Sequence, residues 1–183
     1  SNVFNHDIQA NNILNSSNRH SVFLQNESLA MRAAAHLGVT PKAMEQGRTH
    51  ARLPGRFETV GEKPHIVLDN AHNLEKIRAL TTRLDALPGK LNLVFACVGS
   101  KDGTAMLRML ADHADHIVIT RYTDPFRKCF DPAALYRSLP PRLRRRAMVD
   151  LAPQSAFEKM QQQTSPRDSI LVTGSTMLVG EIR

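Results

Sequence analysis

After Pro54 and Gly55, short apolar segments alternate with segments whose apolar residues repeat at helical spacing. The first clear pair is the run 65–69 (HIVLD), followed by a stretch with apolar residues at positions 74, 77, 80, 84 and 87. Such alternation is typical of parallel strands joined by right-handed crossover helices. The sequence therefore predicts an α/β fold, a three-layer α/β/α Rossmann-like domain with a mostly parallel, about six-stranded sheet.

The expected elements of this domain follow from the same pattern. Strands are predicted at 57–60, 65–69, 91–98, 116–120, 147–150 and 169–173, the first being a candidate for antiparallel pairing. Helices are predicted at 74–87, 103–113, 132–139, 154–163 and 176–182. Asp131 and Pro132 supply the cap and first residue of one helix, and Pro153 opens another.

The first 52 residues have a different character, so we expect two parts, 1–52 and 53–183. Residues 1 to about 25 are polar and rich in Asn and Ser, and are interpreted as strand and loop remnants. An alanine-rich helix is predicted from Asn26 to Leu37, ending at Gly38, and Thr40 and Pro41 start a second helix. A helical hairpin results. Ser1 and Asn2 resemble a tag scar, which indicates that the chain begins inside a longer protein.

Charge and composition exclude several classes. The net charge is +7, and the densest basic run is 142–146 (RLRRR). With two Tyr, no Trp and no aromatic residue among these arginines, the stacking platform of a single-strand binder is missing, so a solvated loop face is favoured over a contact to another domain or to nucleic acid. There is no membrane-spanning run and no targeting leader. Cys97 and Cys129 show neither metal-ligand nor disulfide spacing, which favours a cytoplasmic location.

Chemistry-bearing side chains gather where predicted strands end. In open parallel sheets ligands bind at this edge, so the group Asp69, Asn70, His72 and Asn73 occupies the expected position for a site. The segments 99–103 (GSKDG) and 173–176 (TGST) follow two further strands. The sequence has no phosphate loop of the G-x-x-x-x-G-K-[ST] type and no G-x-G-x-x-G after a strand, so the chain cannot cradle a triphosphate alone.

Each candidate also has a structural alternative. Arg56 offers forked donors to phosphate oxygens, or pairs with a surface carboxylate. Asp69 is suited to ribose hydroxyls, or caps the next helix. Lys101 offers a cation for anionic oxygens and Asp102 an acceptor for an ammonium group, or both form a surface turn. Thr173 and Ser175 bind a carboxylate, or cap the terminal helix.

Five segments together carry a family resemblance: 53–58 (LPGRFE), 67–73 (VLDNAHN), 100–102 (SKD), 171–175 (LVTGS) and 179–183 (VGEIR). They resemble the carboxy-terminal part of folylpolyglutamate synthase, often also a dihydrofolate synthase, in the Mur ligase superfamily. The resemblance covers roughly residues 26–183. Two positions depart from the family pattern, namely Asn70, where glycine is usual, and Leu74, where proline is usual.

The resemblance implies a three-domain, monomeric enzyme that uses ATP, folate and L-glutamate. ATP phosphorylates a folate carboxylate, and the glutamate amine attacks the acyl phosphate. The phosphate loop and the Mg²⁺ ligands are expected in N-terminal and central domains that act in cis and lie outside this chain. Residues 1–52 are expected to be a remnant of the central ATPase domain, and the piece alone is expected to be inactive.

The resemblance also implies roles for single residues. Catalytic roles fall to Arg56, His72 and Lys101, and nucleotide contacts to Arg56, Asp69, Asn70, His72 and Asn73. Glutamate contacts fall to Lys101, Asp102, Thr173 and Ser175, and no metal ligand is expected. Two alternatives stay open: another Mur-type amide ligase acting on peptidoglycan precursors, and a noncatalytic nucleotide-binding module.

Overall fold

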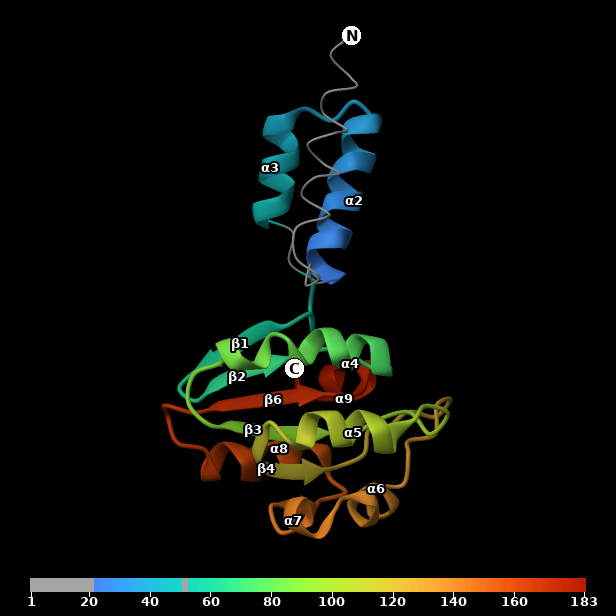
Figure 1. The fold of residues 1–183 in the computed structure, drawn as a ribbon, viewed down its shortest axis with the longest axis vertical. Helices are drawn as coiled ribbons and strands as arrows, with labels where there is room; N and C mark the ends of the chain where they lie inside the picture. The colour runs from blue at the N-terminus through green and yellow to red at the C-terminus, as the bar shows by residue number, and fades with distance from the viewer. Residues whose placement is uncertain (1–21, 51–52) are drawn as a thin grey trace. The chain divides into compact units, whose positions relative to one another are not determined.

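The structure, a computed structural model, describes residues 22–50 and 53–183. The chain divides into two compact units, with the boundary between residues 52 and 53. Figure 1 shows both units. Within the described ranges, no helix is long and apolar enough to cross a bilayer.

The first unit contains a pair of helices, α2 (Val22–His36) and α3 (Pro41–His50). Gly38 adopts a left-handed conformation (φ 77°) between them, and the Thr40 hydroxyl accepts the Ala43 N–H at the start of α3. Arg48 of α3 pairs with Glu27 of α2 at 3.5 Å, which joins the two helices. The predicted helical hairpin is confirmed, but α2 starts at Val22, so the expectation of strand or loop at 22–24 is wrong. The predictions for residues 1–21 lie outside the described residues.

The second unit is built on one six-stranded sheet with the strand order β1-β2-β6-β3-β4-β5. The strands are β1 (Glu58–Glu62), β2 (His65–Leu68), β3 (Leu91–Phe95), β4 (Ala114–Ile119), β5 (Ala147–Val149) and β6 (Ser169–Thr173). Strand β1 pairs antiparallel with β2, and all other neighbours are parallel. The predicted fold class is therefore confirmed, including the antiparallel first strand.

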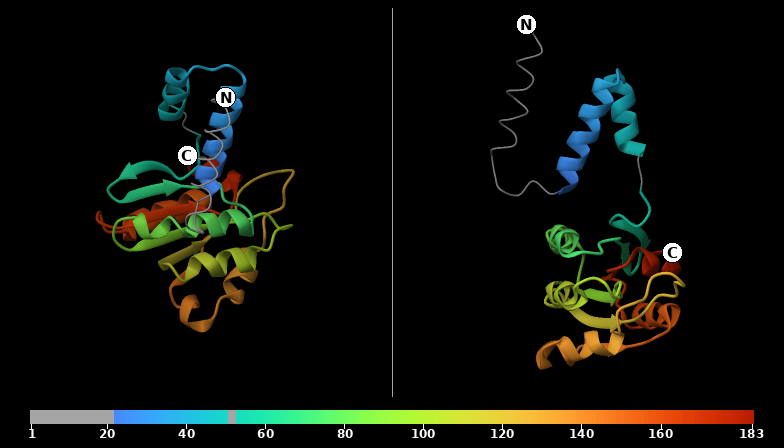
Figure 2. Two further views of the ribbon diagram at one scale, coloured as in Figure 1. Left: turned by 45° about the horizontal axis from the view of Figure 1, so that its top comes forward. Right: turned by 90° about the vertical axis from the view of Figure 1, so that its right-hand side faces the viewer.

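Helices cover both faces of this sheet (Figure 2). One face carries α4 (Leu74–Thr81), the 3-10 helix η1 (Leu84–Ala86), α5 (Gly103–Ala111), α6 (Pro132–Ser138) and α7 (Pro141–Arg144). The other carries α8 (Pro153–Gln163) and α9 (Thr176–Ile182). Because side chains alternate along a strand, neighbouring residues enter different cores: Leu93 packs under α4 and α5, and Val94 packs under α8 and α9.

Two expected elements differ from the structure. The helix predicted at 74–87 ends at Thr81, and a separate 3-10 turn carries Leu84 into the core. The basic run is not simply a loop, because Pro141 starts the short helix α7 and Leu143 is fully buried. Within it, the Arg144 guanidinium donates to the carbonyl oxygens of Arg137 and Leu139, whereas Arg142 pairs with a surface carboxylate. This segment therefore has a packing role.

Candidate functional site

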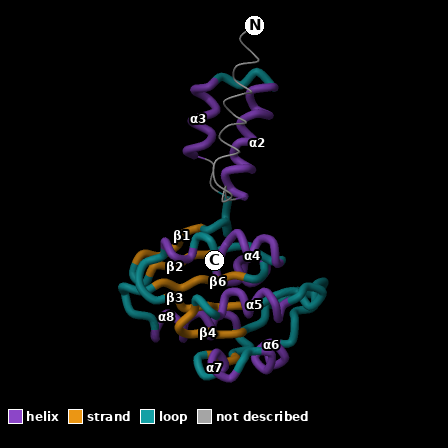
Figure 3. Tube along the Cα trace, in the orientation of Figure 1, coloured by secondary structure: helices purple, strands orange, loops and turns teal. Residues whose placement is uncertain are grey.

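The sheet has a topological switch between two neighbouring strands. The chain leaves β6 toward α9 on one face and leaves β3 toward α5 on the other face. Such a divergence opens a crevice at the carboxyl ends of the strands, where ligands of open α/β sheets bind. Figure 3 shows the loops that gather at this edge.

A cleft of about 920 Å³ lies at this edge. Its walls come from the ends of four strands, β2, β6, β3 and β4. The lining residues are His72, Val98, Gly99, Ser100, Lys101, Phe126, Arg127, Lys128, Cys129, Phe130, Asp131, Ser175, Thr176 and Met177. Three predicted site residues, His72, Lys101 and Ser175, are therefore brought together from segments far apart in the sequence.

His72 is held by hydrogen bonds at both ring nitrogens. Its Nδ1 lies 2.7 Å from the Asn70 carbonyl oxygen, and its Nε2 lies 3.2 Å from Lys76 Nζ. A carbonyl only accepts and an ammonium only donates, so Nδ1 carries the proton and Nε2 accepts. The two contacts therefore favour the tautomer with the proton on Nδ1.

Lys101 and Ser175 reach the cleft from different sides of the switch. Lys101 is exposed just after β3, and within the described residues its side chain forms no ion pair or hydrogen bond. Ser175 is buried, and its Oγ accepts the Met177 N–H at 3.1 Å as the cap of α9. The capping alternative for Ser175 therefore coexists with its place in the cleft wall.

Two other candidates cap helices, and a third is buried. Asn73 Oδ1 accepts the Lys76 N–H and caps α4, and Asp102 Oδ1 accepts the Ala105 N–H and caps α5. Thr173 is fully buried at the end of β6, and its Oγ1 has no hydrogen-bond partner. Neither Asp102 nor Thr173 is among the residues that line the cleft.

Asp69, Arg56 and Asn70 meet at the turn that precedes β1. The buried Asp69 carboxylate accepts the N–H of Phe57 through Oδ2 (2.9 Å) and the N–H of Ala71 through Oδ1 (2.8 Å). Burial raises the pKa of Asp69, against the opposing effect of these two hydrogen bonds and of Arg83 and Arg56. Since Asn73 is the cap of α4, the alternative in which Asp69 caps that helix is wrong.

The backbone of this turn is tightly constrained. Asn70 donates its N–H to the Gly55 carbonyl oxygen at 2.6 Å and its side-chain amide to the Pro54 carbonyl oxygen at 3.2 Å. Gly55 has φ 65°, and a Cβ there would lie 2.6 Å from the Asn70 amide nitrogen. Glycine is thus required at position 55. The turn presents Arg56 as an exposed side chain.

Sequence reasoning missed two features of the site. The guanidinium of Arg83 lies 3.7 Å from the ring centroid of Phe57, and this contact joins the end of α4 to the Arg56 turn. The loop from Phe126 to Asp131 forms one wall of the cleft. A long connection after a parallel strand was visible in the sequence and could have indicated the loop. The sequence around Arg83 did not indicate that its side chain contacts Phe57.

The segments around this site match a known family. A family profile described as "Mur ligase, glutamate ligase domain" matches residues 55–176, which span the Arg56 turn, the Asp69 strand end and the cleft. The chain belongs to the Mur ligase family. The resemblance seen in the sequence is thereby confirmed.

The curated relatives include folylpolyglutamate synthases and a diaminopimelate ligase. A probable bifunctional folylpolyglutamate synthase/dihydropteroate synthase of Haloferax volcanii is 33% identical over 147 residues, covering 79% of this chain and 17% of the relative. A dihydrofolate synthase/folylpolyglutamate synthase of Escherichia coli is 37% identical over 90 residues, covering 48% and 21%. A UDP-N-acetylmuramoyl-L-alanyl-D-glutamate--2,6-diaminopimelate ligase of Corynebacterium glutamicum is 33% identical over 101 residues, covering 52% and 20%.

Solved structures of Mur ligases share the fold. A bifunctional folylpolyglutamate synthase/dihydrofolate synthase of Yersinia pestis, complexed with AMPPNP and Mn, superposes with a TM-score of 0.69 at 28% identity, covering 78% of this chain and 33% of that one. A bifunctional enzyme of the same activities with Mn, AMPPNP and L-glutamate bound gives a TM-score of 0.70 at 28% identity, covering 78% and 34%. The chain thus spans about a fifth of the length of these three curated relatives and about a third of these two solved chains.

The described residues of this Mur ligase domain offer no cluster of three or more His, Cys, Asp or Glu side chains that could hold a metal ion. Its two cysteines are both free thiols, and burial raises the pKa of Cys97 to about 12, so that thiol stays protonated and unreactive near neutral pH. The chemistry available at the site is therefore that of Arg56, His72, Lys101, Ser175 and the loop from Phe126 to Asp131.

Proposed function

We propose that this chain forms the carboxy-terminal domain of an ATP-dependent ligase that joins L-glutamate to folate through an acyl phosphate. The observation that carries the proposal is the cleft, where Lys101, His72 and Ser175 converge at the switch point of a Mur ligase fold. The names of two curated relatives and of a neighbour with bound L-glutamate support folate and glutamate as substrates. The longer protein that would contain this domain is the parent ligase.

The nucleotide would be held from the Arg56 turn. Arg56 is exposed and offers forked donors that suit the oxygens of the transferring phosphoryl group. Each carboxylate oxygen of Asp69 accepts one backbone N–H, which fixes the turn. Each oxygen has a second lone pair, which can accept a hydrogen bond from a ribose hydroxyl. Asn70 and Asn73 keep this strand end in place through the turn and the α4 cap.

The amino acid would be held in the cleft. The ammonium of Lys101 has no partner among the described residues, so it is free to meet a glutamate carboxylate or the acyl phosphate. His72, with Nε2 as acceptor, suits a contact with the attacking amine once Lys76 turns away. Asp102 and Thr173 would contribute indirectly: Asp102 caps α5, and Thr173 is buried at the end of β6. ATP and Mg²⁺ would need further residues, which we assign to N-terminal and central domains, with residues 1–52 as the end of the central one.

The test is an assay of the parent ligase with ATP, Mg²⁺, a folate acceptor and L-glutamate. We expect Lys101→Ala to lower kcat/KM for glutamate by ~10-fold or more, the scale of a lost charge-assisted contact. Lys90→Ala is the matched control, because Lys90 is an exposed lysine directly before β3, at the opposite end of that strand from Lys101. No glutamate-dependent product, or equal effects of the two variants, would count against the proposal. This chain alone is expected to show no turnover and to bind ATP no tighter than about −6 kcal/mol.

A second candidate is a ligase that acts on a peptidoglycan precursor, favoured by the similarity to the Corynebacterium glutamicum enzyme. The same assay separates the two functions. If the parent ligase joins an amino acid to a UDP-N-acetylmuramoyl peptide and leaves folate unchanged, the folate assignment is wrong and the ligase assignment stands.

A further inference from the structure

We infer that the loop carrying Phe126, Arg127 and Lys128 is a binding wall for an extended polycarboxylate, namely a chain of linked glutamates on the acceptor. This inference rests on the proposed function for the identity of the acceptor. The assignment of the loop as an anion-binding wall rests on the charge and geometry of the cleft.

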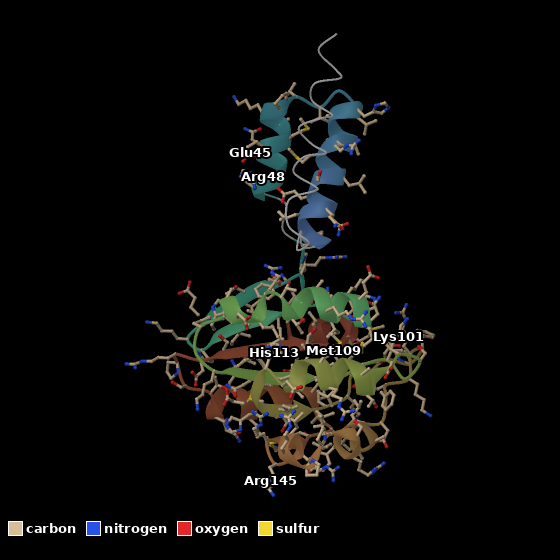
Figure 4. All side chains as sticks on the ribbon, in the orientation of Figure 1. Glu45, Arg48, Lys101, Met109, His113 and Arg145 are labelled. Carbon is tan, nitrogen blue, oxygen red and sulfur yellow. The ribbon has the colours of Figure 1, made fainter. Side chains whose placement is uncertain are left out.

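The cleft contains more positive charge than a single amino acid needs. Lys101, Arg127 and Lys128 all line it, and within the described residues none of the three side chains forms an ion pair or a hydrogen bond. Figure 4 labels Lys101 at the loop edge of the domain. A cluster of like charges without partners focuses a field that attracts a multiply charged anion.

The carboxylates near these cations are already engaged. Asp131 lines the cleft, but it accepts the Ala133 N–H at the start of α6 and pairs with Arg137 at 3.6 Å. Asp124 accepts the N–H groups of Phe126 and Arg127. Both carboxylates keep their charge, but neither forms an ion pair with Lys101, Arg127 or Lys128.

The loop is anchored, so its cations have a defined place. Gly99 donates its N–H to the Lys128 carbonyl oxygen at 2.8 Å, and Phe130 donates to the Cys97 carbonyl oxygen at 2.8 Å. Val98 and Cys129 form an antiparallel bridge between these two bonds. The segment after β4 is thus fastened to the segment after β3, and both line the same cleft.

The donors on this wall suit separated carboxylates better than a phosphate. Phosphate sites use a concave group of free backbone N–H donors. Here the N–H groups of Phe126, Arg127, Gly99 and Lys101 are all committed to acceptors within the chain. The positive charges of the cleft stand on three long, flexible side chains spread around a volume of about 920 Å³.

The proposed reaction produces such a ligand. When the amine of glutamate joins a side-chain carboxyl of the acceptor, the new residue adds a free α-carboxylate beside the amide bond. Each round therefore lengthens a row of carboxylates on the acceptor. We expect Arg127 and Lys128 to bind these carboxylates while Lys101 faces the incoming amino acid.

A binding experiment on this chain tests the inference without any need for ligase activity. The probe is fluorescein-labelled tetra-γ-glutamate, followed by fluorescence anisotropy. Arg127→Ala/Lys128→Ala should weaken binding by ~10-fold or more, because two charged contacts are lost. The control Arg108→Ala/Arg145→Ala removes the same charge from exposed positions outside the cleft lining, and it should weaken binding less than about twofold, the scale of a general charge effect. Figure 4 shows Arg145 well apart from Lys101.

Three results would overturn the inference: no binding of the probe, equal weakening by the two double variants, or displacement of the probe by tripolyphosphate at lower concentrations than by unlabelled tetra-γ-glutamate. In the parent ligase, the cleft variant should raise KM for acceptors with several glutamates and leave KM for one-glutamate acceptors and for ATP unchanged. A parent ligase that adds no glutamate to folate contradicts the proposed function. The anisotropy measurement tests polycarboxylate binding by the loop independently of that activity.

Discussion

Asp69 and Phe57 are twelve residues apart in the sequence and are joined by a 2.9 Å hydrogen bond from the Phe57 N–H to Asp69 Oδ2. Phe57 has φ 49°, a conformation that a bulky residue adopts only when its surroundings hold it there. The Arg83 guanidinium lies 3.7 Å from the centroid of its ring. Asp69 therefore fixes the strained residue that directly follows Arg56, which makes it a positioning residue for the exposed arginine.

We expect Asp69→Asn to destabilise the second unit by about 1–3 kcal/mol. The carboxylate accepts two backbone N–H groups, whereas an amide has one oxygen, so its NH₂ would face one of the two donors. Urea unfolding of this chain, followed by circular dichroism, measures the difference. Asp85→Asn is the control, because Asp85 is exposed and its side chain has no hydrogen bond or ion pair within the described residues. Equal unfolding midpoints for the two variants would show that Asp69 is not required for the turn.

The raised pKa of Asp69 gives this contribution a definite pH dependence. In the folded state the group keeps its proton to a higher pH than the ordinary value of 3.8, so between the two pKa values the folded state binds more protons than the unfolded state. The free energy of unfolding of the wild type relative to Asp69→Asn should therefore fall as the pH rises from 3.8 through the folded pKa.

Asp150 should show the opposite slope. Lys159, Ser155 and the Ala152 N–H lower the pKa of Asp150, so its contribution is present above 3.8 and is lost as the pH falls through the lower folded value. Unfolding of the wild type, Asp69→Asn and Asp150→Asn over a series of pH values tests both signs. If the free energy of unfolding relative to the wild type changed with pH in the same direction for both variants, the opposite pKa shifts of Asp69 and Asp150 would be contradicted.

The sequence predicted the strands and the ends of several helices because those features are local. Apolar runs locate β3 and β6 within a few residues, and the Asp131 cap with Pro132 locates the start of α6. The insertion of β6 between β2 and β3 was not predictable in this way, because the order of parallel strands depends on pairings between distant segments. The cleft depends on that order, since it brings Ser175 between His72 and Lys101.

The contacts of single side chains were harder to predict from the sequence. Asn73 and Asp69 both stand near the start of α4 and both are good caps, and only the structure shows that Asn73 caps the helix while Asp69 turns back to Phe57. Arg83 reaches Phe57 from the end of α4. The periodicity of the sequence predicts neither the Asp69–Phe57 bond nor the Arg83–Phe57 contact, because both depend on how the Arg56 turn folds against β2.

The ion pair of Glu58 and Arg183 should matter less than the backbone contact that Glu58 also makes. Glu58 Oε2 accepts both the Gly55 N–H and the Arg183 guanidinium. Exposed ion pairs contribute about 0–1 kcal/mol, so Arg183→Ala should cost less than ~1 kcal/mol. Glu58→Ala also leaves the Gly55 N–H without its acceptor, and we expect it to cost ~1–2 kcal/mol. Glu62→Ala, on the exposed end of β1, is the control in the same unfolding series. A larger effect of Arg183→Ala than of Glu58→Ala would reverse this ranking.

In the parent ligase, Arg56→Ala should lower kcat by ~10²-fold or more, because a guanidinium that meets charge developing on the phosphoryl group acts in the transition state. Arg78→Ala is the matched control on the exposed side of α4. Steady-state kinetics with ATP, folate and glutamate give the comparison. If kcat is unchanged in Arg56→Ala while the wild type is active, Arg56 has only a surface role.

Two glycines of the terminal segment should respond in opposite ways to alanine. Gly174 has φ 100°, and a Cβ there would lie 2.4 Å from the Ala96 carbonyl oxygen and 2.5 Å from the Phe95 ring. The Gly174 N–H is also bonded to the Ala71 carbonyl oxygen, so the backbone has little room to move away. Gly174→Ala should therefore destabilise the domain by at least about 2 kcal/mol, through both strain and overlap.

Gly180 lies inside α9, is exposed, and has nothing within 4 Å of the position of an added Cβ. Alanine there restricts the unfolded chain and improves helix propensity, so Gly180→Ala should stabilise the domain by ~0.5–1 kcal/mol. Urea unfolding midpoints of the two variants, measured side by side with the wild type, check both signs. A Gly174→Ala protein as stable as the wild type would mean that the β6–α9 turn beneath Ser175 is not fixed in the conformation that places this residue in the cleft wall.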